Sequence, residues 1–183
     1  MTITVVEFIT LDGIVSDPDG SGGSPQGGWM FRYGTEGVVN DPFRLGATLD
    51  DGVLLLGRST WQAFSKLWPT RTDSFSDRMN AVPKLVATRH LSDVSAWSNS
   101  AVIDGDLAEA VREEKRDVVV MGSLRVVATL AAEDLIDEYR LISFPTVIGE
   151  GERLFPEGAR TDLECILAEQ VGAVVRTRYR RVR

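Results

Sequence analysis

Three short segments of this sequence carry residue types that hold phosphate groups. Gly57-Arg58-Ser59-Thr60, Thr88-Arg89 and Gly122-Ser123-Leu124-Arg125 each follow a short apolar run. Glycine lets an anion approach the backbone, hydroxyl and guanidinium groups donate hydrogen bonds, and a helix N-terminus adds unpaired N–H groups. One such segment alone is ordinary turn chemistry. Their recurrence after three apolar runs predicts a site for a phosphorylated nucleotide.

The second segment indicates which nucleotide to expect. A hydroxyl next to a guanidinium, as in Thr88-Arg89, suits a phosphate monoester such as the 2′-phosphate of NADPH. No Gly-x-Gly-x-x-Gly follows an expected strand, so the dinucleotide must be held without a Rossmann fingerprint. One histidine (His90) and one cysteine (Cys165) are too few for a Cys/His zinc site. The chemistry of an enzyme is therefore expected to come from a cofactor, with no metal.

Two acidic residues are candidates for the proton donor that reduction of a C=N or C=O bond needs. Asp41 is the first: it lies near the start of an expected helix and sixteen residues before Gly57, a spacing that resembles the placement of the substrate-binding acid in dihydrofolate reductases. The alternative is an ordinary helix-start aspartate, with Pro42 in the first turn. Asp12 is the second candidate, and its alternative is plain turn chemistry before Gly13.

Aromatic residues could bind a flat substrate ring. Trp29, together with Phe31 and Tyr33, could stack on a pterin or a pyrimidine, or it could anchor the preceding loop to the core. Trp61 lies on one face of an expected helix, and it could either belong to the core or contact the substrate.

The elements that must position these residues alternate between strands and helices. Strands are expected at residues 2–9, 53–56, 83–88, 100–103, 118–121, 135–144, 163–171 and 174–182. Helices are expected at residues 38–50, from 57 onward, 106–115 and 124–132. Residues 17–28 are rich in glycine and predict a long mobile loop, either a lid or a surface insertion. This order predicts one α/β domain over residues 1–183, a three-layer α-β-α fold with a mostly parallel sheet and an antiparallel C-terminal hairpin.

Composition limits the partners and the compartment. The net charge of −7 disfavours a nucleic-acid partner. Arg176, Arg178 and Arg180 alternate along the last expected strand and are expected on one face, paired with acidic residues. No apolar run reaches the roughly 18 residues of a membrane span. The start lacks the basic region of a signal peptide and there is one cysteine, so a cytoplasmic protein is expected.

Several blocks resemble a known family. They are Thr10-Leu11-Asp12-Gly13, residues 54–61, residues 83–89, residues 119–123, residues 135–138, and residues 145–155 ending in Gly-Glu-Arg-Leu-Phe. Their order and spacing, from about residue 3 to about residue 182, resemble the C-terminal reductase domain of bacterial bifunctional riboflavin deaminase-reductases. Stand-alone relatives with the dihydrofolate reductase fold share this pattern.

The resemblance implies an eight-stranded sheet, NADPH as hydride donor and a homodimer. It implies that the phosphates of NADPH lie on Gly57, Arg58, Ser59 and Thr60. Thr88 and Arg89 flank the 2′-phosphate and the adenine. The segment that covers the pyrophosphate consists of Gly122, Ser123, Leu124, Arg125 and Val126. Backbone near Val15 meets the nicotinamide amide, and the glycine-rich loop acts as a lid. This sequence departs from the family where Ser123 replaces the second of two adjacent glycines, at a turn where a tight, cis peptide is possible.

The substrate stays open at this level. Two candidates within the class are the ribosylamino-pyrimidine phosphate of riboflavin synthesis and dihydrofolate. The first needs a second phosphate site, for which Arg32, Arg44 and Lys66 are candidates. A non-catalytic nucleotide-binding protein that retains the fold and a flavin-binding reductase remain alternatives.

Overall fold

The structure is a computed structural model that describes residues 1–183. Its contacts divide the chain into two compact units, and neither unit is contiguous in sequence. Unit 1 consists of Met1–Val6 and Arg44–Asp137, and unit 2 consists of Glu7–Phe43 and Glu138–Arg183. Strand β1 (Ile3–Thr10) contributes its first half to unit 1 and its second half to unit 2.

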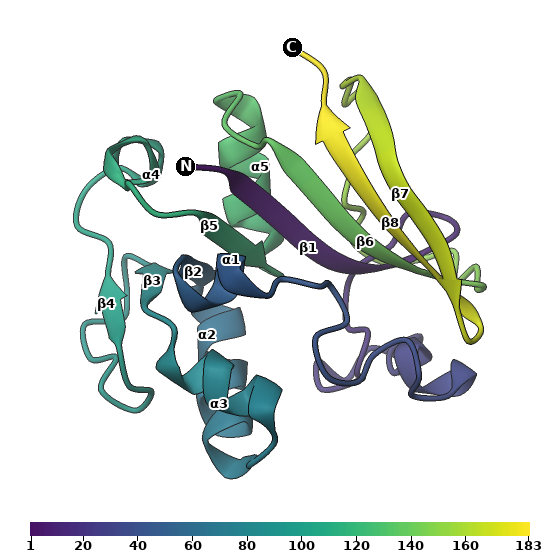
Figure 1. Cartoon of the computed structure of the whole chain (residues 1–183), viewed down its shortest axis with the longest axis horizontal. Coiled ribbons are helices and arrows are strands. Elements are labelled where there is room, and N and C mark those ends of the chain that lie inside the picture. Colours follow the sequence, from purple (N-terminus) through teal and green to yellow (C-terminus); the bar gives the residue numbers. More distant parts are fainter. The chain divides into compact units, whose positions relative to one another are not determined.

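Unit 1 is built from alternating strands and helices (Figure 1). After β1 its elements are α1 (Ala47–Asp50), β2 (Val53–Gly57), α2 (Arg58–Leu67), η2 (Trp68–Thr70), α3 (Ser74–Ala81), β3 (Lys84–Ala87), β4 (Ser100–Val102), α4 (Leu107–Glu113), β5 (Val118–Met121) and α5 (Leu124–Ala132). Its strands pair in parallel. Parallel strands need long crossovers, and helices supply them here.

The helices of unit 1 form two layers around its strands. The chain crosses from β1 to β2 and on to β3 and β4 in one direction along the sheet, and it returns from β4 to β5 in the other. Because such crossovers are right-handed, opposite directions place their helices on opposite faces. In agreement, α1 packs near α3, and α4 packs near α5. All four residues of β5 are buried, as expected for a strand covered on both faces.

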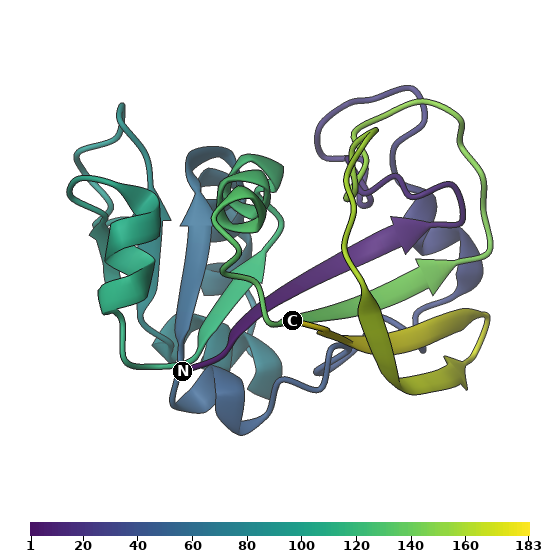
Figure 2. The same ribbon diagram turned by 90° about the horizontal axis from the view of Figure 1, so that it is seen from above.

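Unit 2 ends in an antiparallel sheet. Its further elements are η1 (Trp29–Tyr33), β6 (Glu138–Phe144), β7 (Leu163–Val171) and β8 (Val174–Arg181). Strand β8 pairs antiparallel with β6 on one side and with β7 on the other. Figure 2 shows β7 and β8 as neighbouring arrows of the C-terminal hairpin. The predicted hairpin is therefore confirmed, whereas the predicted strand at residues 135–144 begins only at Glu138.

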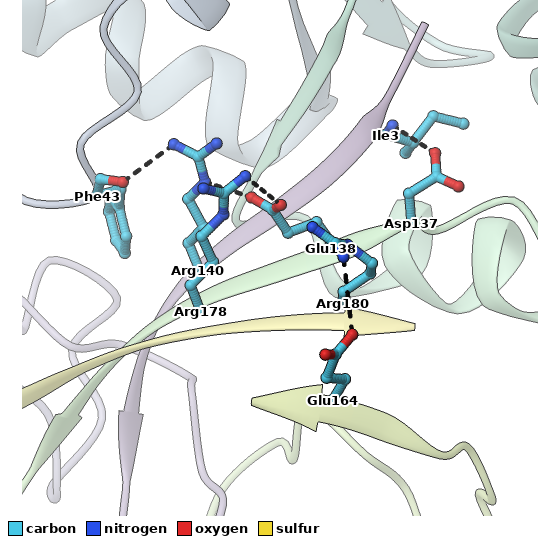
Figure 3. Close-up of polar contacts among 8 residues, drawn as sticks. All are labelled: Ile3, Phe43, Asp137, Glu138, Arg140, Glu164, Arg178 and Arg180. Carbon is cyan, nitrogen blue, oxygen red and sulfur yellow. Dashed lines mark hydrogen bonds and ion pairs between the residues drawn. The ribbon is translucent and has the colours of Figure 1, made fainter. Parts of the chain in front are cut away.

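The arginines of β8 lie on one face and are paired, as the sequence predicts. Arg178 and Arg140 both contact Glu138 at 2.6 Å, and the Nη1 of Arg140 donates to the Phe43 carbonyl at 3.3 Å (Figure 3). Arg176 pairs with Glu169 at 2.9 Å and Arg180 with Glu164 at 3.7 Å. Each of these cations thus has an acidic partner within unit 2.

The glycine-rich segment at residues 17–28 closes on itself around one aspartate. The Asp17 carboxylate accepts hydrogen bonds from the N–H groups of Gly22 at 2.7 Å and Ser24 at 2.8 Å. The N–H of Gly28 donates to the Asp17 carbonyl at 3.0 Å. A Cβ on Gly27 would lie 2.3 Å from the Asp17 carboxylate, so only glycine fits against it. The segment is irregular, as predicted, but it is internally hydrogen-bonded.

The predicted helix at residues 38–50 is wrong for most of its length. Only Ala47–Asp50 is helical. Asn40, Arg44 and Gly46 have φ values of +61°, +51° and +48°, which a right-handed helix cannot contain. Asp41 therefore lies in an irregular segment and not near a helix start.

The strands form a sheet in the order β4-β3-β2-β5-β1-β6-β8-β7. The fold is α/β, with a mixed eight-stranded sheet and an antiparallel C-terminal hairpin, in agreement with the predicted class. No helix is long and apolar enough to span a membrane.

Candidate functional site

The three predicted phosphate-binding segments lie at one edge of the sheet in unit 1. Strands β2, β3 and β5 are parallel neighbours, with Gly57 opposite Ala87 and Leu55 opposite Val120. Their carboxyl ends therefore meet at the same edge, where open α/β sheets bind ligands. Helix α2 begins directly after β2, and Gly122 and Ser123 separate α5 from β5.

The two helices that begin at this edge lack caps. Neither α2 nor α5 has a side-chain cap or an acidic residue in its first turn. In contrast, Asp73 and Asp106 cap α3 and α4, and each carboxylate accepts two backbone N–H groups. Uncapped N-terminal N–H groups, together with the helix dipole, favour an anion. The α2 and α5 N-termini are therefore suited to phosphate.

Three arginines at this edge have no partner in the chain. Arg58 is the first residue of α2, Arg125 is the second of α5, and Arg89 follows β3 by two residues. All three are exposed, and none forms a hydrogen bond or an ion pair in the structure. In a chain of net charge −7, three unpaired guanidinium groups at adjacent strand ends concentrate positive charge where the helix N-termini open.

Close packing at this edge requires glycine at two positions. A Cβ on Gly57 would lie 3.2 Å from the Ser123 side chain, and a Cβ on Gly122 would lie 3.3 Å from Thr60. Gly122 also has φ +62°, which side chains rarely adopt. Ser123 adopts φ +65° and ψ +59°, and the structure contains no cis peptide bond, so the Gly122–Ser123 peptide is trans. These glycines let the ends of β2 and β5 pack closely against Ser123 and Thr60.

Strand β3 is held by buried contacts at its beginning and by a turn at its carboxyl end. The Nζ of Lys84 donates to the carbonyls of Asn80 at 2.7 Å and Ser98 at 3.0 Å, and it lies 4.4 Å from the ring centroid of Trp97. Burial lowers the pKa of Lys84 to about 8. The Oγ1 of Thr88 accepts the His90 N–H at 3.1 Å. This turn holds the Thr88 hydroxyl at the end of β3, next to the predicted position of the 2′-phosphate.

The structure disfavours Asp12, the second predicted acid, as a proton donor. Its carboxylate accepts hydrogen bonds from the Thr10 hydroxyl at 2.5 Å and from the N–H of Gly149 at 2.7 Å. Desolvation raises the pKa of Asp12, but these bonds outweigh it and hold the pKa below its usual value. An aspartate that stays ionised is a poor general acid. The geometry favours the turn alternative, in which Asp12 ties β1 to residues 148–149.

The structure places the two predicted substrate-binding tryptophans in the core. Trp29 is 0% exposed, its Nε1 donates to the Ser16 carbonyl at 3.3 Å, and its ring lies 5.2 Å from that of Phe144. Trp61 is 4% exposed, and its Nε1 donates to the Ser100 hydroxyl at 2.9 Å. Both observations favour the anchoring and core alternatives over a contact with substrate.

The remaining predicted contacts of unit 2 are untested by the geometry. Val15 is buried, and its N–H donates to the Glu152 carbonyl at 2.9 Å, so only its carbonyl is open to a nicotinamide amide. Asp41 is partly exposed. Their roles toward cofactor and substrate stay predictions.

Sequence reasoning missed one buried acid. Glu7 lies on β1 and is 7% exposed, and its Oε1 is buried without a hydrogen-bond partner. Burial raises the pKa of Glu7 to about 8, so the carboxyl group keeps its proton at neutral pH. The available signal was a single acid within the apolar run of residues 3–9. Buried acids with raised pKa values are candidates for functional groups.

Comparison with known proteins agrees with this fold. At 21% sequence identity, a crystal structure of a protein assigned to riboflavin biosynthesis from Shewanella sp. PV-4 superimposes with a TM-score of 0.75, and both chains are covered completely. The uncharacterized protein YwjB of Bacillus subtilis (strain 168) is 26% identical over 174 residues, which cover 93% of this chain and 92% of YwjB. The family model described as the RibD C-terminal domain matches residues 1–176. The chain therefore belongs to the RibD C-terminal domain family.

Proposed function

We propose that this chain is a reductase that binds NADPH and reduces a small heterocyclic or carbonyl/imine substrate. The observation that carries the proposal is the edge of unit 1, where two uncapped helix N-termini and three unpaired arginines meet. Membership of the RibD C-terminal domain family supports a reductase. When bound, NADPH supplies the hydride.

The donors at this edge fit a phosphorylated dinucleotide. Arg58, Ser59 and Thr60 offer N–H, guanidinium and hydroxyl donors to its phosphates, next to Gly57, whose own N–H donates to the Ser123 hydroxyl. The segment that leads into α5 consists of Gly122, Ser123, Leu124, Arg125 and Val126. The Val126 N–H donates to the Ser123 carbonyl at 2.7 Å, and the N–H groups before it are the donors proposed for the pyrophosphate. Thr88 and Arg89 offer a hydroxyl and a cation to the 2′-phosphate that distinguishes NADPH from NADH.

The proton for the partner atom has three candidate sources. Asp41 is the predicted one, and the ionised state of Asp12 disfavours the second. Glu7 is added because burial keeps it protonated at neutral pH. Replacement of each by its amide, as Asp41→Asn, Asp12→Asn and Glu7→Gln, should slow turnover only for the true donor, while NADPH affinity stays nearly unchanged.

Among substrates we favour a ribosylamino-pyrimidine phosphate of the kind used in riboflavin synthesis, because of the family. Such a substrate needs a second phosphate site. Arg140, Arg176 and Arg178 are already paired with glutamates, so they are weak candidates. Arg32, Arg44 and Lys66 stay the candidates. Arg32 donates to the Gly27 carbonyl at 3.5 Å and Arg44 also has a partner in the chain, so Lys66 is the first of the three to test. Dihydrofolate is the alternative substrate.

The test is a titration of the protein with NADPH and with NADH, monitored by nicotinamide fluorescence. The proposal expects saturable binding, with NADPH preferred. If neither nucleotide binds, the cofactor assignment is wrong, and if NADH is preferred, the role of Thr88 and Arg89 is wrong.

Binding alone does not distinguish a reductase from a non-catalytic nucleotide-binding protein. NADPH oxidation with the pyrimidine, dihydrofolate and simple carbonyl substrates separates these alternatives. A flavin titration monitored by flavin absorbance tests the flavin-binding alternative.

We also propose a homodimer, on the basis of the family resemblance. Sedimentation equilibrium measures the mass directly, and a monomer at micromolar concentration would contradict this part of the proposal.

A further inference from the structure

Ser123 uses its hydroxyl in an unusual way for its position. A serine that precedes a helix commonly accepts an N–H from the first turn of that helix. Ser123 precedes α5, but it does not cap it. Its Oγ instead accepts the N–H of Gly57 at 2.7 Å and donates to the Oγ1 of Thr60 at 2.8 Å. The hydroxyl therefore links the start of α5 to the start of α2.

This link decides which donors remain open. The Gly57 N–H is occupied, and the first-turn N–H groups of α5 are left without a side-chain cap. Because Thr60 accepts from Ser123, the proton of the Thr60 hydroxyl is free to point elsewhere. In such a relay each hydrogen bond polarises the next, so Thr60 becomes a stronger donor.

The backbone indicates that the hydroxyl matters more than the conformation. Ser123 has φ +65°, a region that favours glycine over any residue with a side chain. The residue at this position is a serine although its backbone is strained, and its side chain makes two short hydrogen bonds. The contacts of the hydroxyl are therefore the feature to test.

We propose that Ser123 is a positioning residue, which orients the Thr60 hydroxyl and holds the α2 and α5 N-termini together to bind one phosphoryl group. That group belongs to the pyrophosphate shared by NADPH and NADH, because Thr88 and Arg89 are assigned to the 2′-phosphate. This inference rests on the proposed NADPH binding.

The experiment compares Ser123→Ala with Ser123→Gly. Both variants lose the hydroxyl, but only glycine relieves the strained backbone. Each variant should bind NADPH and NADH about 5- to 10-fold more weakly than the original chain, with the NADPH to NADH preference unchanged. The melting temperature without nucleotide is measured in parallel, and Ser123→Gly should be the more stable of the two.

A double-mutant cycle tests whether Ser123 acts through Thr60. If it does, Ser123→Ala combined with Thr60→Val should bind NADPH about as weakly as the weaker single variant. Thr60→Ser keeps the hydroxyl and should bind nearly as the original chain does. A merely structural role would lower the melting temperature and leave the Kd of the folded protein unchanged.

The outcomes separate this inference from the proposal on which it rests. If the original chain binds neither nucleotide, both are overturned. If the original chain binds NADPH, and Ser123→Gly binds it equally tightly or more tightly, only the role of Ser123 is overturned. A changed NADPH to NADH preference would assign Ser123 to the 2′-phosphate and would also overturn the inference.

Discussion

The helices of unit 1 begin in two different ways. Helices α3 and α4 start with Asp73 and Asp106, whose carboxylates each accept two N–H groups. Helices α2 and α5 start without a side-chain cap, although a serine stands directly before α5. The chain thus satisfies the helix ends that serve stability, and it leaves open the two that follow β2 and β5. The contrast supports the proposal that the second pair binds a ligand.

Other polar groups show the same contrast. The arginines of β6 and β8 are paired with glutamates, as Arg140, Arg176 and Arg178 show. In contrast, Arg58 at the start of α2 and Arg89 after β3 have no partner. Among carboxyl groups, Asp12 is held by several hydrogen bonds, whereas the Oε1 of Glu7 is buried without one. Groups that the chain leaves unsatisfied should affect binding or pH dependence, and satisfied groups should affect stability alone.

The largest expected effect concerns Glu7. Burial raises the pKa of Glu7 from its ordinary value of 4.5 to about 8 in the folded chain. The contribution of Glu7 to the free energy of unfolding is fully present below pH 4.5 and is lost as the pH rises through 8. The reason is that the unfolded chain releases this proton at lower pH than the folded chain does. At about 1.4 kcal/mol per pKa unit, the rise of the pKa from 4.5 to about 8 corresponds to a loss on the order of 5 kcal/mol. Glu7→Gln should remove this dependence, as measured by urea unfolding between pH 5 and 9.

The control for Glu7 is Asp12→Asn. The pKa of Asp12 is lowered, so its contribution is present above pH 3.8 and is lost only as the pH falls through the folded value. It should not change the pH dependence between 5 and 9. If the free energy of unfolding falls equally with pH in the original chain and in Glu7→Gln, the raised pKa of Glu7 is contradicted.

The next largest effect concerns Arg89, one of the unpaired cations. Arg89→Ala should weaken NADPH binding about 10- to 100-fold, because a charge-assisted bond to a phosphate monoester is lost. NADH binding should change little, since NADH lacks the 2′-phosphate. Fluorescence titration measures both affinities. Arg180→Ala, which removes a paired arginine of β8, is the matched control, and equal losses in both variants would contradict the comparison.

A smaller effect is expected at a capped helix end. Asp106→Ala should lower the free energy of unfolding by about 1 kcal/mol, because two N–H groups of α4 lose their acceptor. NADPH affinity should not change. Asp106→Asn keeps an acceptor and should retain most of the stability. A marked loss of binding in Asp106→Ala would remove the distinction between the two kinds of helix end.

The smallest effect is expected at an exposed ion pair. Glu164 and Arg180 are 3.7 Å apart, and both side chains are more than half exposed. Glu164→Gln should change the free energy of unfolding by less than about 0.5 kcal/mol, and added salt should reduce the difference further. Thermal unfolding at low and high salt measures it. A larger change would contradict the expectation that an exposed ion pair between β7 and β8 adds little to stability.

Local patterns predicted most of the elements and the edge of the site. The runs at 53–56 and 118–121 are short and apolar because their strands are buried on both faces, so they could be recognised without a structure. Glycine and hydroxyl residues directly after them predicted a phosphate-binding edge, which stays a prediction. The alternation of Arg176, Arg178 and Arg180 predicted their common face, because the strand period of two is local.

The errors fall where local preference competes with distant contacts. Residues 38–50 suit a helix by composition, but Asn40, Arg44 and Gly46 adopt positive φ. Asp41 consequently lost its predicted helix position. Trp29 could not be assigned to substrate or core from sequence, because its burial depends on Phe144, more than a hundred residues away.

The sequence by itself determined the α/β class, the three strand ends with their arginines and, at two of them, glycines, and the C-terminal hairpin. Each depends on residues close together in the chain. Only the tertiary structure decided that Glu7 is buried and protonated, that Asp12 is ionised, and that the Ser123 hydroxyl joins Gly57 to Thr60. The physical reason is that desolvation and hydrogen-bond partners come from segments distant in sequence, and residue spacing does not encode them.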